Sequence, residues 1–381
     1  MWSWPRASVY ELSQAPNIRY VHSDRYRPYA YDKPFSVQNI TEFCPHLVHP
    51  SKSHDNRDWR FCDGTTPGRM AMHVIMQKDG MFDRGADMMG ATFDARRVYL
   101  MAHPFRPKLH MQNVVHYPRL AQALEPYAGE AQSHFWFGTV QHVLTLYDAL
   151  PEDVPIVVAW SNALAKLYDM LDLNMSRIIP FHPQNTYHAG ELYSVVYEPW
   201  SRHVQGGEPV SPQSFVRLKN HLKWIPLPRA ADRPSIVLID RADRGVRRCR
   251  NHEQLAATAE RFVQNNSMQL TRFVGDRFSM AEARAIFQGT KLVVAPHGGA
   301  LLNIVFMVPQ TGVVEIGYYE RNAMNYRSMR FPPWYFVMAK HLGLHYSLVM
   351  APGSYNGHID CPVDSVVSAM STYFRTHRSH T

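Results

Sequence analysis

Hydrophobic positions recur with two different periods along most of this chain, and the alternation of these periods predicts strands separated by helices. Short apolar runs over 154–160, 235–240 and 291–296 are typical of strands that are covered on both faces of a sheet. Apolar residues at helical spacing predict helices over 133–151, which ends at a proline, and over 251–266. Strands that alternate with helices in this way form parallel sheets with helices on both faces.

The remaining elements extend this pattern. Further strands are expected at 71–76, 96–102, 176–181, 191–198, 270–275 and 311–319. Further helices are expected at 162–171, 214–225, 278–289, 298–308 and 363–377. The pattern Ser-x-x-Glu at Ser279 and Glu282 is the signature of a capping box at a helix start. The sequence therefore predicts an α/β protein.

The expected elements fall into two Rossmann-like halves. Residues 1–65 are rich in Pro, Tyr, Asp, Asn and His, and their lack of periodicity predicts an irregular N-terminal arm. Residues 199–212 are rich in Gly, Pro and Ser and are typical of a linker. We therefore expect an N-terminal domain over 66–205, a C-terminal domain over 206–362, and a last helix within 363–381 that packs back on the N-terminal domain.

Composition narrows the class of partner. Hydrophobic residues make up 45% of the 381 positions and charged residues 19%, a balance typical of folded globular proteins. The net charge of +8 indicates an anionic partner, either a nucleic acid or a phosphorylated small molecule. The basic residues are spread along the chain, with their densest cluster at 241–250. Charge alone does not choose between the two partners.

The four cysteines, Cys44, Cys62, Cys249 and Cys361, form no CxxC pair. A bridge between Cys44 and Cys62 and a set of four free thiols are both open interpretations. The sequence lacks the run of about 18 apolar residues that spans a membrane and the apolar core of a signal peptide. We expect a soluble chain, either cytoplasmic or a luminal fragment of an enzyme of the Golgi or endoplasmic reticulum.

Three stretches of the second half are expected at the carboxyl ends of parallel strands, where such sheets bind ligands. Residues 296–299, Pro-His-Gly-Gly, join a strand to a helix whose first N–H groups suit a phosphate. Residues 240–251 carry several arginines, whose guanidinium forks match phosphate oxygens. Glu315 is a carboxylate in an apolar strand, and ribose hydroxyls are typical partners of such a group.

Each stretch also has a structural interpretation: a tight turn capped by His297, a solvated basic loop, and a salt bridge at Glu315. Together the three favour a nucleotide-diphosphate site. The GxGxxG fingerprint, the Walker Lys-Ser/Thr pair and the Asp-x-Asp cluster are absent from the sequence. Their absence argues against a dinucleotide enzyme, an NTPase and a metal-dependent transferase of the Asp-x-Asp type. The zinc patterns HExxH and HxH are absent as well.

These residues resemble glycosyltransferase family 61, which includes plant β-1,2-xylosyltransferases and animal O-linked N-acetylglucosaminyltransferases. The family pattern has an Arg after the first strand of this half, Arg-x-x-x-Asn before the next helix, a Gly-x-His-Gly-Ala-Gly-Leu-Thr-Asn turn and a Val-Val-Glu-Ile strand. The chain departs from the turn at Ala295, at the order of Gly299 and Ala300, and at Leu302. The matching residues are Arg241, Arg247, Asn251, His297, Gly298, Leu301, Asn303 and Glu315.

The resemblance is close over 233–350 and faint over 130–200. It implies a GT-B architecture with two facing Rossmann-like domains, an inverting mechanism, a UDP-sugar donor, and no required metal or cofactor. It implies a glycan or glycoprotein hydroxyl as acceptor and no nucleic acid partner; xylose is preferred to N-acetylglucosamine because it is frequent in the family. The residues implied in donor binding are Arg241, Arg247, Asn251, His297, Gly298, Gly299, Asn303 and Glu315.

The base that takes the acceptor's proton is expected in the first half, across from the donor. Asp83 and Asp87 lie in the turn region after the strand at 71–76, and His134 lies at the start of the helix over 133–151. Turn formation by the aspartates and helix capping by the histidine are the structural alternatives.

Two other functions are alternatives to a transferase. Another nucleotide-sugar enzyme, such as an epimerase, would need the GxGxxG motif, which the sequence lacks. A non-catalytic protein that binds carbohydrate or nucleic acid on the same fold is compatible with the faint resemblance of the first half. A thermal-shift screen of UDP, UDP-sugars, GDP-sugars and oligonucleotides separates these functions.

Overall fold

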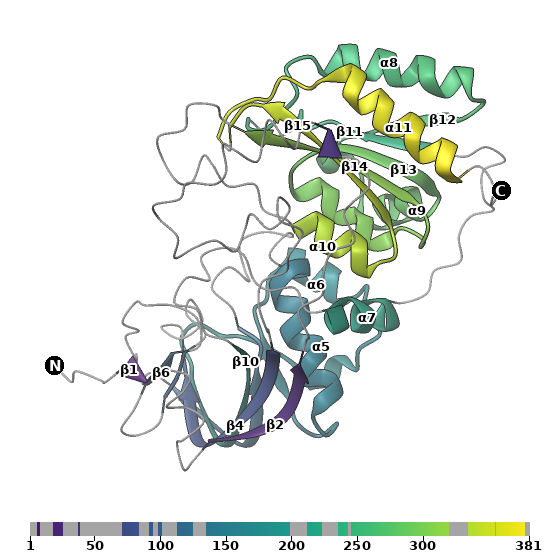
Figure 1. The fold of residues 1–381 in the computed structure, drawn as a ribbon. Helices are drawn as coiled ribbons and strands as arrows, with labels where there is room; N and C mark the ends of the chain where they lie inside the picture. The colour runs from purple at the N-terminus through teal and green to yellow at the C-terminus, as the bar shows by residue number, and fades with distance from the viewer. Residues whose placement is uncertain are drawn as a thin grey trace. The chain divides into compact units, whose positions relative to one another are not determined.

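The chain folds into two compact units, each built around its own sheet. Unit 1 comprises Met1–Pro28 and Pro67–Lys223, and unit 2 comprises Tyr29–Thr66 and Trp224–Thr381. Figure 1 colours the chain from purple at the N-terminus to yellow at the C-terminus. The computed structural model describes residues 6–7, 18–25, 37–38, 71–83, 91–93, 98–100, 113–124, 135–198, 212–222, 235–242, 245–319, 334–354 and 356–377.

Unit 1 contains a mixed sheet with the strand order β1-β6-β5-β4-β10-β7-β8-β9, in which β2 also pairs with β4. β10, β7, β8 and β9 pair in parallel, whereas β4 is antiparallel to β10, β2 and β5. This unit is therefore only partly a parallel sheet. Its strands are β1 (Arg6–Ala7), β2 (Ile18–Arg25), β4 (Ala71–Phe82), β5 (Ala91–Phe93), β6 (Val98–Leu100), β7 (Val114–Gln122), β8 (Ile156–Val158), β9 (Ile178–Pro180) and β10 (Thr186–Glu198).

The helices of unit 1 pack through apolar residues at helical spacing. The π-helical turn η2 (Phe135–Thr139) leads into α5 (Val140–Ala149), which contacts β4, β8 and β10. α7 (Pro212–His221) buries Phe215 and Leu218 and packs on α5, where Arg217 and His221 both reach Asp148. The other helices are α6 (Asn162–Tyr168) and η3 (Met175–Arg177).

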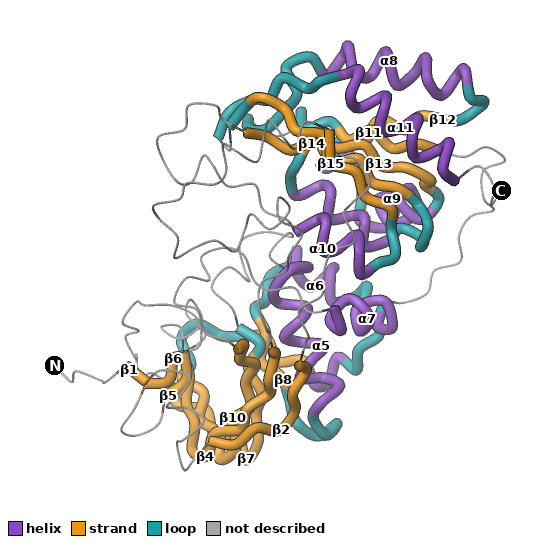
Figure 2. The backbone as a smooth tube through the Cα atoms, in the orientation of Figure 1, coloured by secondary structure: helices purple, strands orange, loops and turns teal. Residues whose placement is uncertain are grey.

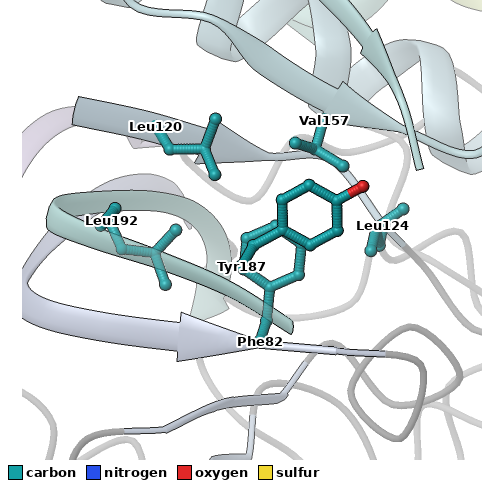
Figure 3. Packing of buried hydrophobic residues seen from close by; sticks show 7 residues of the cluster. Phe82, Leu120, Leu124, Val157, Tyr187 and Leu192 are labelled. Atoms are coloured by element: carbon teal, nitrogen blue, oxygen red, sulfur yellow. The ribbon is translucent and has the colours of Figure 1, made fainter. Parts of the chain in front are cut away.

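The core of unit 1 contains a stacked pair of aromatic rings. Phe82, the last residue of β4, lies parallel to Tyr187 on β10, with ring centroids 4.9 Å apart. Leu120, Leu124, Val157 and Leu192 surround this pair (Figure 3). Ala159 and Phe181, which directly follow β8 and β9, pack against the same cluster. The cluster therefore extends to the carboxyl ends of these two strands.

Unit 2 contains a sheet whose described strands all pair in parallel, in the order β12-β11-β13-β14-β15-β3. The buried runs of β11, β13 and β14 are almost wholly apolar, as expected for strands covered on both faces. The strands are β3 (Val37–Gln38), β11 (Ser235–Ile239), β12 (Gln269–Phe273), β13 (Thr290–Pro296), β14 (Gly312–Tyr319) and β15 (His345–Pro352).

Helices cover the two faces of the unit 2 sheet. Figure 2 shows α8 and α11 on one side of the strands and α9 and α10 on the other. The capping box of Ser279 and Glu282 at the start of α9 is confirmed. Among the described residues, no helix is long and apolar enough to cross a membrane. The helices are α8 (His252–Asn265), η4 (Gly275–Arg277), α9 (Met280–Gln288), the 3-10 helix η5 (Gly299–Phe306), α10 (Trp334–His341) and α11 (Val363–His377).

Three segments of the expected N-terminal arm form β-strands, and the first of them, β1, pairs in parallel with β6. β2 pairs antiparallel with β4 in unit 1, and β3 pairs in parallel with β15 in unit 2. The expectation of an irregular arm is wrong for these segments, because their order comes from pairing with distant strands and leaves no local periodicity. The rest of residues 1–65, and the linker at 199–211, lie outside the described residues.

Two helices belong to other units than the sequence led us to expect. α7 was expected after the domain boundary near residue 205, yet it packs on α5 in unit 1 because its buried face and its cations both find partners there. α11 was expected to pack back on the N-terminal domain, yet it contacts α8, β14 and β15 and belongs to unit 2. The boundary therefore lies near residue 223.

The buried histidine of α5 makes the stability of unit 1 depend on pH. Burial lowers the pKa of His142 from 6.5 to about 4. Between these values the unfolded chain binds a proton that the folded chain does not, so the free energy of unfolding falls as the pH falls. The loss contributed by this group amounts to about 2 kcal/mol between about pH 7 and pH 5.

We therefore expect the free energy of unfolding to fall less between about pH 7 and pH 5 in His142→Gln than in the wild type. Urea unfolding at each pH measures this free energy. His116→Gln, at an exposed histidine of β7, is the control for the removal of a histidine elsewhere in unit 1. An unchanged pH dependence in His142→Gln would contradict this explanation.

Candidate functional site

The carboxyl edge of the unit 2 sheet brings together three of the residues that the sequence singled out. Arg241 comes two residues after β11, His297 directly follows β13, and Glu315 lies within β14. β13 lies between β11 and β14, and Ala295 on β13 pairs with Glu315. All three side chains are buried. The expectation that parallel strands carry these groups to one edge is confirmed.

The guanidinium of Arg241 lies directly against the backbone of Gly298. A Cβ atom at Gly298 would overlap the Nη1 and Cζ atoms of Arg241. The Nε of Arg241 donates to the carbonyl of Val246, 3.2 Å away, which fixes the plane of the guanidinium. Gly298 is also the residue that precedes η5, so the cation lies at the start of this helix. The absence of a side chain is what allows this approach.

Glu315 is fully buried, and each of its oxygens accepts a hydrogen bond. Its Oε1 lies 2.5 Å from Nδ1 of His297, and its Oε2 accepts from the hydroxyl of Tyr346 on β15. A carboxylate only accepts, so the proton of the first bond is on Nδ1 and the lone pair of a neutral imidazole is on Nε2. Glu315 therefore fixes both the orientation and the tautomer of His297.

The surroundings keep His297 in its neutral form. Burial lowers the pKa of His297, the contact with Glu315 opposes this effect, and Arg247 and Arg241 add to it through their positive charges. The same two arginines act on the buried Tyr335 of α10. Among the described residues, the guanidiniums of Arg241 and Arg247 and the carboxylate of Glu315 thus all act on His297. The balance of charge favours an anion.

Tyr335 closes the site from the side of α10. Its hydroxyl donates to the carbonyl of Gly298, 2.6 Å away. Its ring stands edge-on to the ring of His297, with centroids 5.3 Å apart, and Tyr318 on β14 stands edge-on at 5.7 Å. The histidine is therefore held by packing on its ring as well as by its bond to Glu315.

The arginine loop after β11 is fastened to a second loop near the C-terminus. The N–H of Arg247 donates to the carbonyl of Gly357, 2.5 Å away, and Ile359 exchanges backbone hydrogen bonds with Arg248 and Arg250. Arg247 adopts a left-handed backbone conformation, with φ of 56°, which is uncommon for a residue with a side chain. The second loop therefore holds the arginine loop in a shape that it would not adopt alone.

A disulfide and an asparagine complete this attachment. Cys249 is bonded to Cys361, 112 residues away, and a loop of this length implies about 4 to 5 kcal/mol of stabilisation on the chain-entropy estimate. The side-chain amide of Asn251 donates to the carbonyl of Cys361 at 2.8 Å and accepts from its N–H at 3.1 Å. The interpretation with four free thiols is wrong, and Cys44 and Cys62 lie outside the described residues.

Among the described residues, Asn251, Asn303 and Gly299 make no hydrogen bond with Arg241, His297 or Glu315. Asn251 precedes α8 at the N-cap position, but its side chain binds Cys361 and does not cap the helix. Asn303 donates to the carbonyl of Ala300 at 2.9 Å, which ties the first turn of η5 together. Gly299 is exposed, and a Cβ atom there would meet no atom within 4 Å. These residues shape the loops that carry Arg247 and Gly298.

The three candidate bases are expected in unit 1. Asp83 directly follows β4 and is buried. Asp87 and His134 lie outside the described residues. The choice between the three stays a prediction.

The comparison with known proteins agrees with this geometry. The family model described as Glycosyltransferase 61 matches residues 38–314, which is most of the chain. The chain belongs to glycosyltransferase family 61. No curated protein matches it at a significant level. The members of family 61 are glycosyltransferases, which move a sugar from a donor to an acceptor.

The family 61 match includes the arginine loop and the turn after β13, and it ends one residue before Glu315. The partners of Glu315 were missed by sequence reasoning. Tyr346 lies in a strand that the sequence analysis did not predict, and its meeting with Glu315 depends on the register of β14 and β15. Cys249 and Cys361 were missed as a pair because their spacing follows no local pattern.

A group of metal-ligand type lies near this family 61 site. Among the described residues, Asp240, His252 and Glu253 bring ligand atoms within 4.8 Å of one another. Arg248 donates to Asp240 at 3.3 Å, and Arg272 donates to Glu253 at 3.1 Å. The carboxylates of this group therefore already face arginines, and the group carries no metal assignment.

A pocket of about 230 Å³ lies in unit 2, away from the arginine loop. It is lined by Leu292, Val313 and His345 near the amino ends of their strands and by Tyr373 and His377 of α11. Ligands of parallel α/β sheets bind beyond the carboxyl ends. The pocket therefore lies toward the opposite edge of the sheet from Arg241 and Gly298, although Tyr346, which binds Glu315, also lines it.

The two neighbouring glycines allow a matched test of the Arg241 contact. Gly298→Ala places a methyl group where the Arg241 guanidinium lies, whereas Gly299→Ala adds one to open space. For UDP, the leaving group of the donor that the family resemblance implies, we expect Gly298→Ala to weaken binding by about tenfold, measured by titration calorimetry, since the guanidinium must move. Gly299→Ala should bind UDP as the wild type does. Equal affinities of the two variants would contradict the role given to Arg241.

Proposed function

We propose that this family 61 protein is an inverting, metal-independent transferase that uses a UDP-sugar. It moves the sugar to a hydroxyl group of a glycan or glycoprotein, with xylose as the preferred sugar and N-acetylglucosamine as the second choice. In this proposal the two units form a GT-B arrangement, with the donor on unit 2 and the acceptor on unit 1. Family membership and the chemistry of the site around His297 support it.

The observation that carries the proposal is the contact of Arg241 with Gly298 at the start of η5. A helix start offers N–H groups to an anion, and a guanidinium beside it adds a fixed positive charge. Arg247 contributes a second charge that acts on the same residues. Such a set of donors suits the two phosphates of UDP and can stabilise the charge that grows on them as the sugar leaves.

The protonation state of His297, which is bonded to Glu315, can change when the negatively charged diphosphate binds. His297 is neutral in the free protein because burial lowers its pKa. A diphosphate nearby adds negative charge, which favours protonation of the imidazole at Nε2. Glu315, already bonded to Nδ1, then stabilises the imidazolium. In this way a cation is formed only when the leaving group is present.

This geometry favours an indirect role for Glu315 over the ribose contact that its sequence suggested. Both of its oxygens are engaged, by His297 and by Tyr346, and it has no exposed surface. A ribose hydroxyl would have to displace one of these partners. We therefore assign Glu315 as a positioning residue that acts through His297.

The reaction is a single displacement at the anomeric carbon. The acceptor oxygen forms a bond to this carbon as the bond to the β-phosphate oxygen breaks, and UDP leaves with the electron pair. The proton of the acceptor hydroxyl passes to a base of unit 1, for which Asp83, Asp87 and His134 are the candidates. The arginines and η5 perform the charge stabilisation for which other transferases use a metal.

The disulfide bears on where this reaction takes place. Disulfides persist in oxidising compartments and are rare in the cytosol. The bond between Cys249 and Cys361 therefore favours the luminal alternative over the cytoplasmic one.

The proposal is tested by incubating the full chain with UDP-xylose, UDP-N-acetylglucosamine or a GDP-sugar, with mixed glycan acceptors and excess EDTA. We expect UDP to be released and a glycoside of inverted anomeric configuration to form. NMR identifies the anomeric configuration of this product. The Gly298→Ala variant is the control for contaminating activity and should be strongly impaired.

Three outcomes would count against specific parts of the proposal. Loss of activity in EDTA that Mn²⁺ restores would contradict metal independence. A retained anomeric configuration would contradict the single displacement. Stabilisation by UDP without any transfer would favour a non-catalytic binding protein.

A further inference from the structure

Two parallel strands of unit 1 end side by side and place an exposed tryptophan at their carboxyl edge. β8 ends at Val158 and β9 at Pro180, and these residues are paired. The N–H of Phe181 still donates to the carbonyl of Val158, 2.8 Å away, so the pairing extends one residue further. Trp160 and His182 follow the two strands. The carboxyl edge of parallel strands is where α/β sheets bind ligands.

Trp160 is held as a flat platform. Its ring is stacked on that of Tyr168, with centroids 5.5 Å apart and planes at 6°, so the two rings are parallel and offset and one face of the indole is partly covered. Tyr168 is fully buried and stands edge-on against Phe135. Trp160 nevertheless keeps 38% of its surface exposed. An aromatic ring that packs on one side and is exposed to solvent elsewhere can stack on a flat ligand without a large loss of conformational entropy.

The turn that follows β9 carries polar side chains that are open to solvent. His182 and Gln184 follow β9. The N–H of His182 donates to the hydroxyl of Tyr187 at 2.9 Å, which fixes the backbone of this turn. A sugar ring combines an apolar C–H face with hydroxyl groups around its rim. It therefore matches an indole face flanked by hydrogen-bonding side chains.

The platform and one candidate base are both sequence neighbours of residues in one packed cluster of unit 1. Ala159, next to Trp160, and Phe181, next to His182, pack against the cluster that contains Phe82 and Tyr187. Figure 3 shows the stacked rings of Phe82 and Tyr187 below Val157 of β8. Asp83 directly follows Phe82. Trp160 and Asp83 are thus each one residue along the chain from a residue of this packed region.

We propose that Trp160 is the stacking platform for a sugar ring of the acceptor, with His182 and Gln184 at its rim. This inference rests on the proposed function, because it names the acceptor as a carbohydrate bound to unit 1. The chemical class that the platform recognises is a neutral oligosaccharide. A charged partner is not required, since the exposed surface here is an indole face.

The test compares wild type, Trp160→Ala and Trp160→Phe in the full chain. Tyr20→Ala is the matched control, because Tyr20 on β2 is exposed to the same extent, 39%. Xylo-oligosaccharides and chito-oligosaccharides are titrated into each protein by calorimetry, with and without saturating UDP. The affinity for UDP is measured on the same preparations, and thermal unfolding checks the fold.

We expect Trp160→Ala to weaken oligosaccharide binding by about tenfold, which is the loss of one aromatic stacking contact. Trp160→Phe should restore most of the affinity, and Tyr20→Ala should match the wild type. The affinity for UDP should be the same in all four proteins, since its site lies on unit 2. A merely structural role of Trp160 would instead lower the unfolding temperature and UDP affinity together.

The inference is overturned if Trp160→Ala binds the oligosaccharides as tightly as the wild type, or if the wild type binds none of them. Failure of UDP to bind any of the proteins contradicts the proposed function instead. The titrations without UDP then still decide whether Trp160 binds carbohydrate. The two failures are therefore distinguishable.

Discussion

The buried contact between His297 and Glu315 is the interaction on which the site depends. A carboxylate with no exposed surface needs partners for both of its oxygens, and His297 and Tyr346 provide them. Because β14 lies next to β13, this requirement fixes the histidine at the end of β13 in one orientation. The turn that follows, with Gly298 under the Arg241 guanidinium, then has a fixed starting point.

The other parts of unit 2 support this turn from outside. Tyr335 of α10 binds the carbonyl of Gly298, while the loop at 353–361 binds the arginine loop through backbone hydrogen bonds and the bond between Cys249 and Cys361. These attachments hold the guanidiniums of Arg241 and Arg247 in place despite the repulsion between their positive charges. Such prearranged charge is how a protein stabilises a leaving group without reorganising during the reaction.

The sequence predicts unit 2 better than unit 1, for physical reasons. The strands and helices of a parallel α/β sheet have local signatures, so β11, β13, β14 and the capping box of α9 could be predicted. Contacts between distant segments leave no such signature. The pairing of β2 with β4, the packing of α7 and α11, and the role of Tyr346 depend on register and on tertiary partners, and these were missed or misplaced.

The most direct test of the central claim, that Glu315 acts through His297 on the diphosphate, compares UDP with inorganic pyrophosphate. Calorimetry on wild type, Glu315→Gln and Tyr346→Phe would give both affinities for each protein. Since pyrophosphate has no ribose, an indirect role predicts that Glu315→Gln weakens both ligands by a similar factor, about tenfold, and that Tyr346→Phe has a smaller effect. Weakened UDP binding with unchanged pyrophosphate binding would contradict the account and restore the ribose contact.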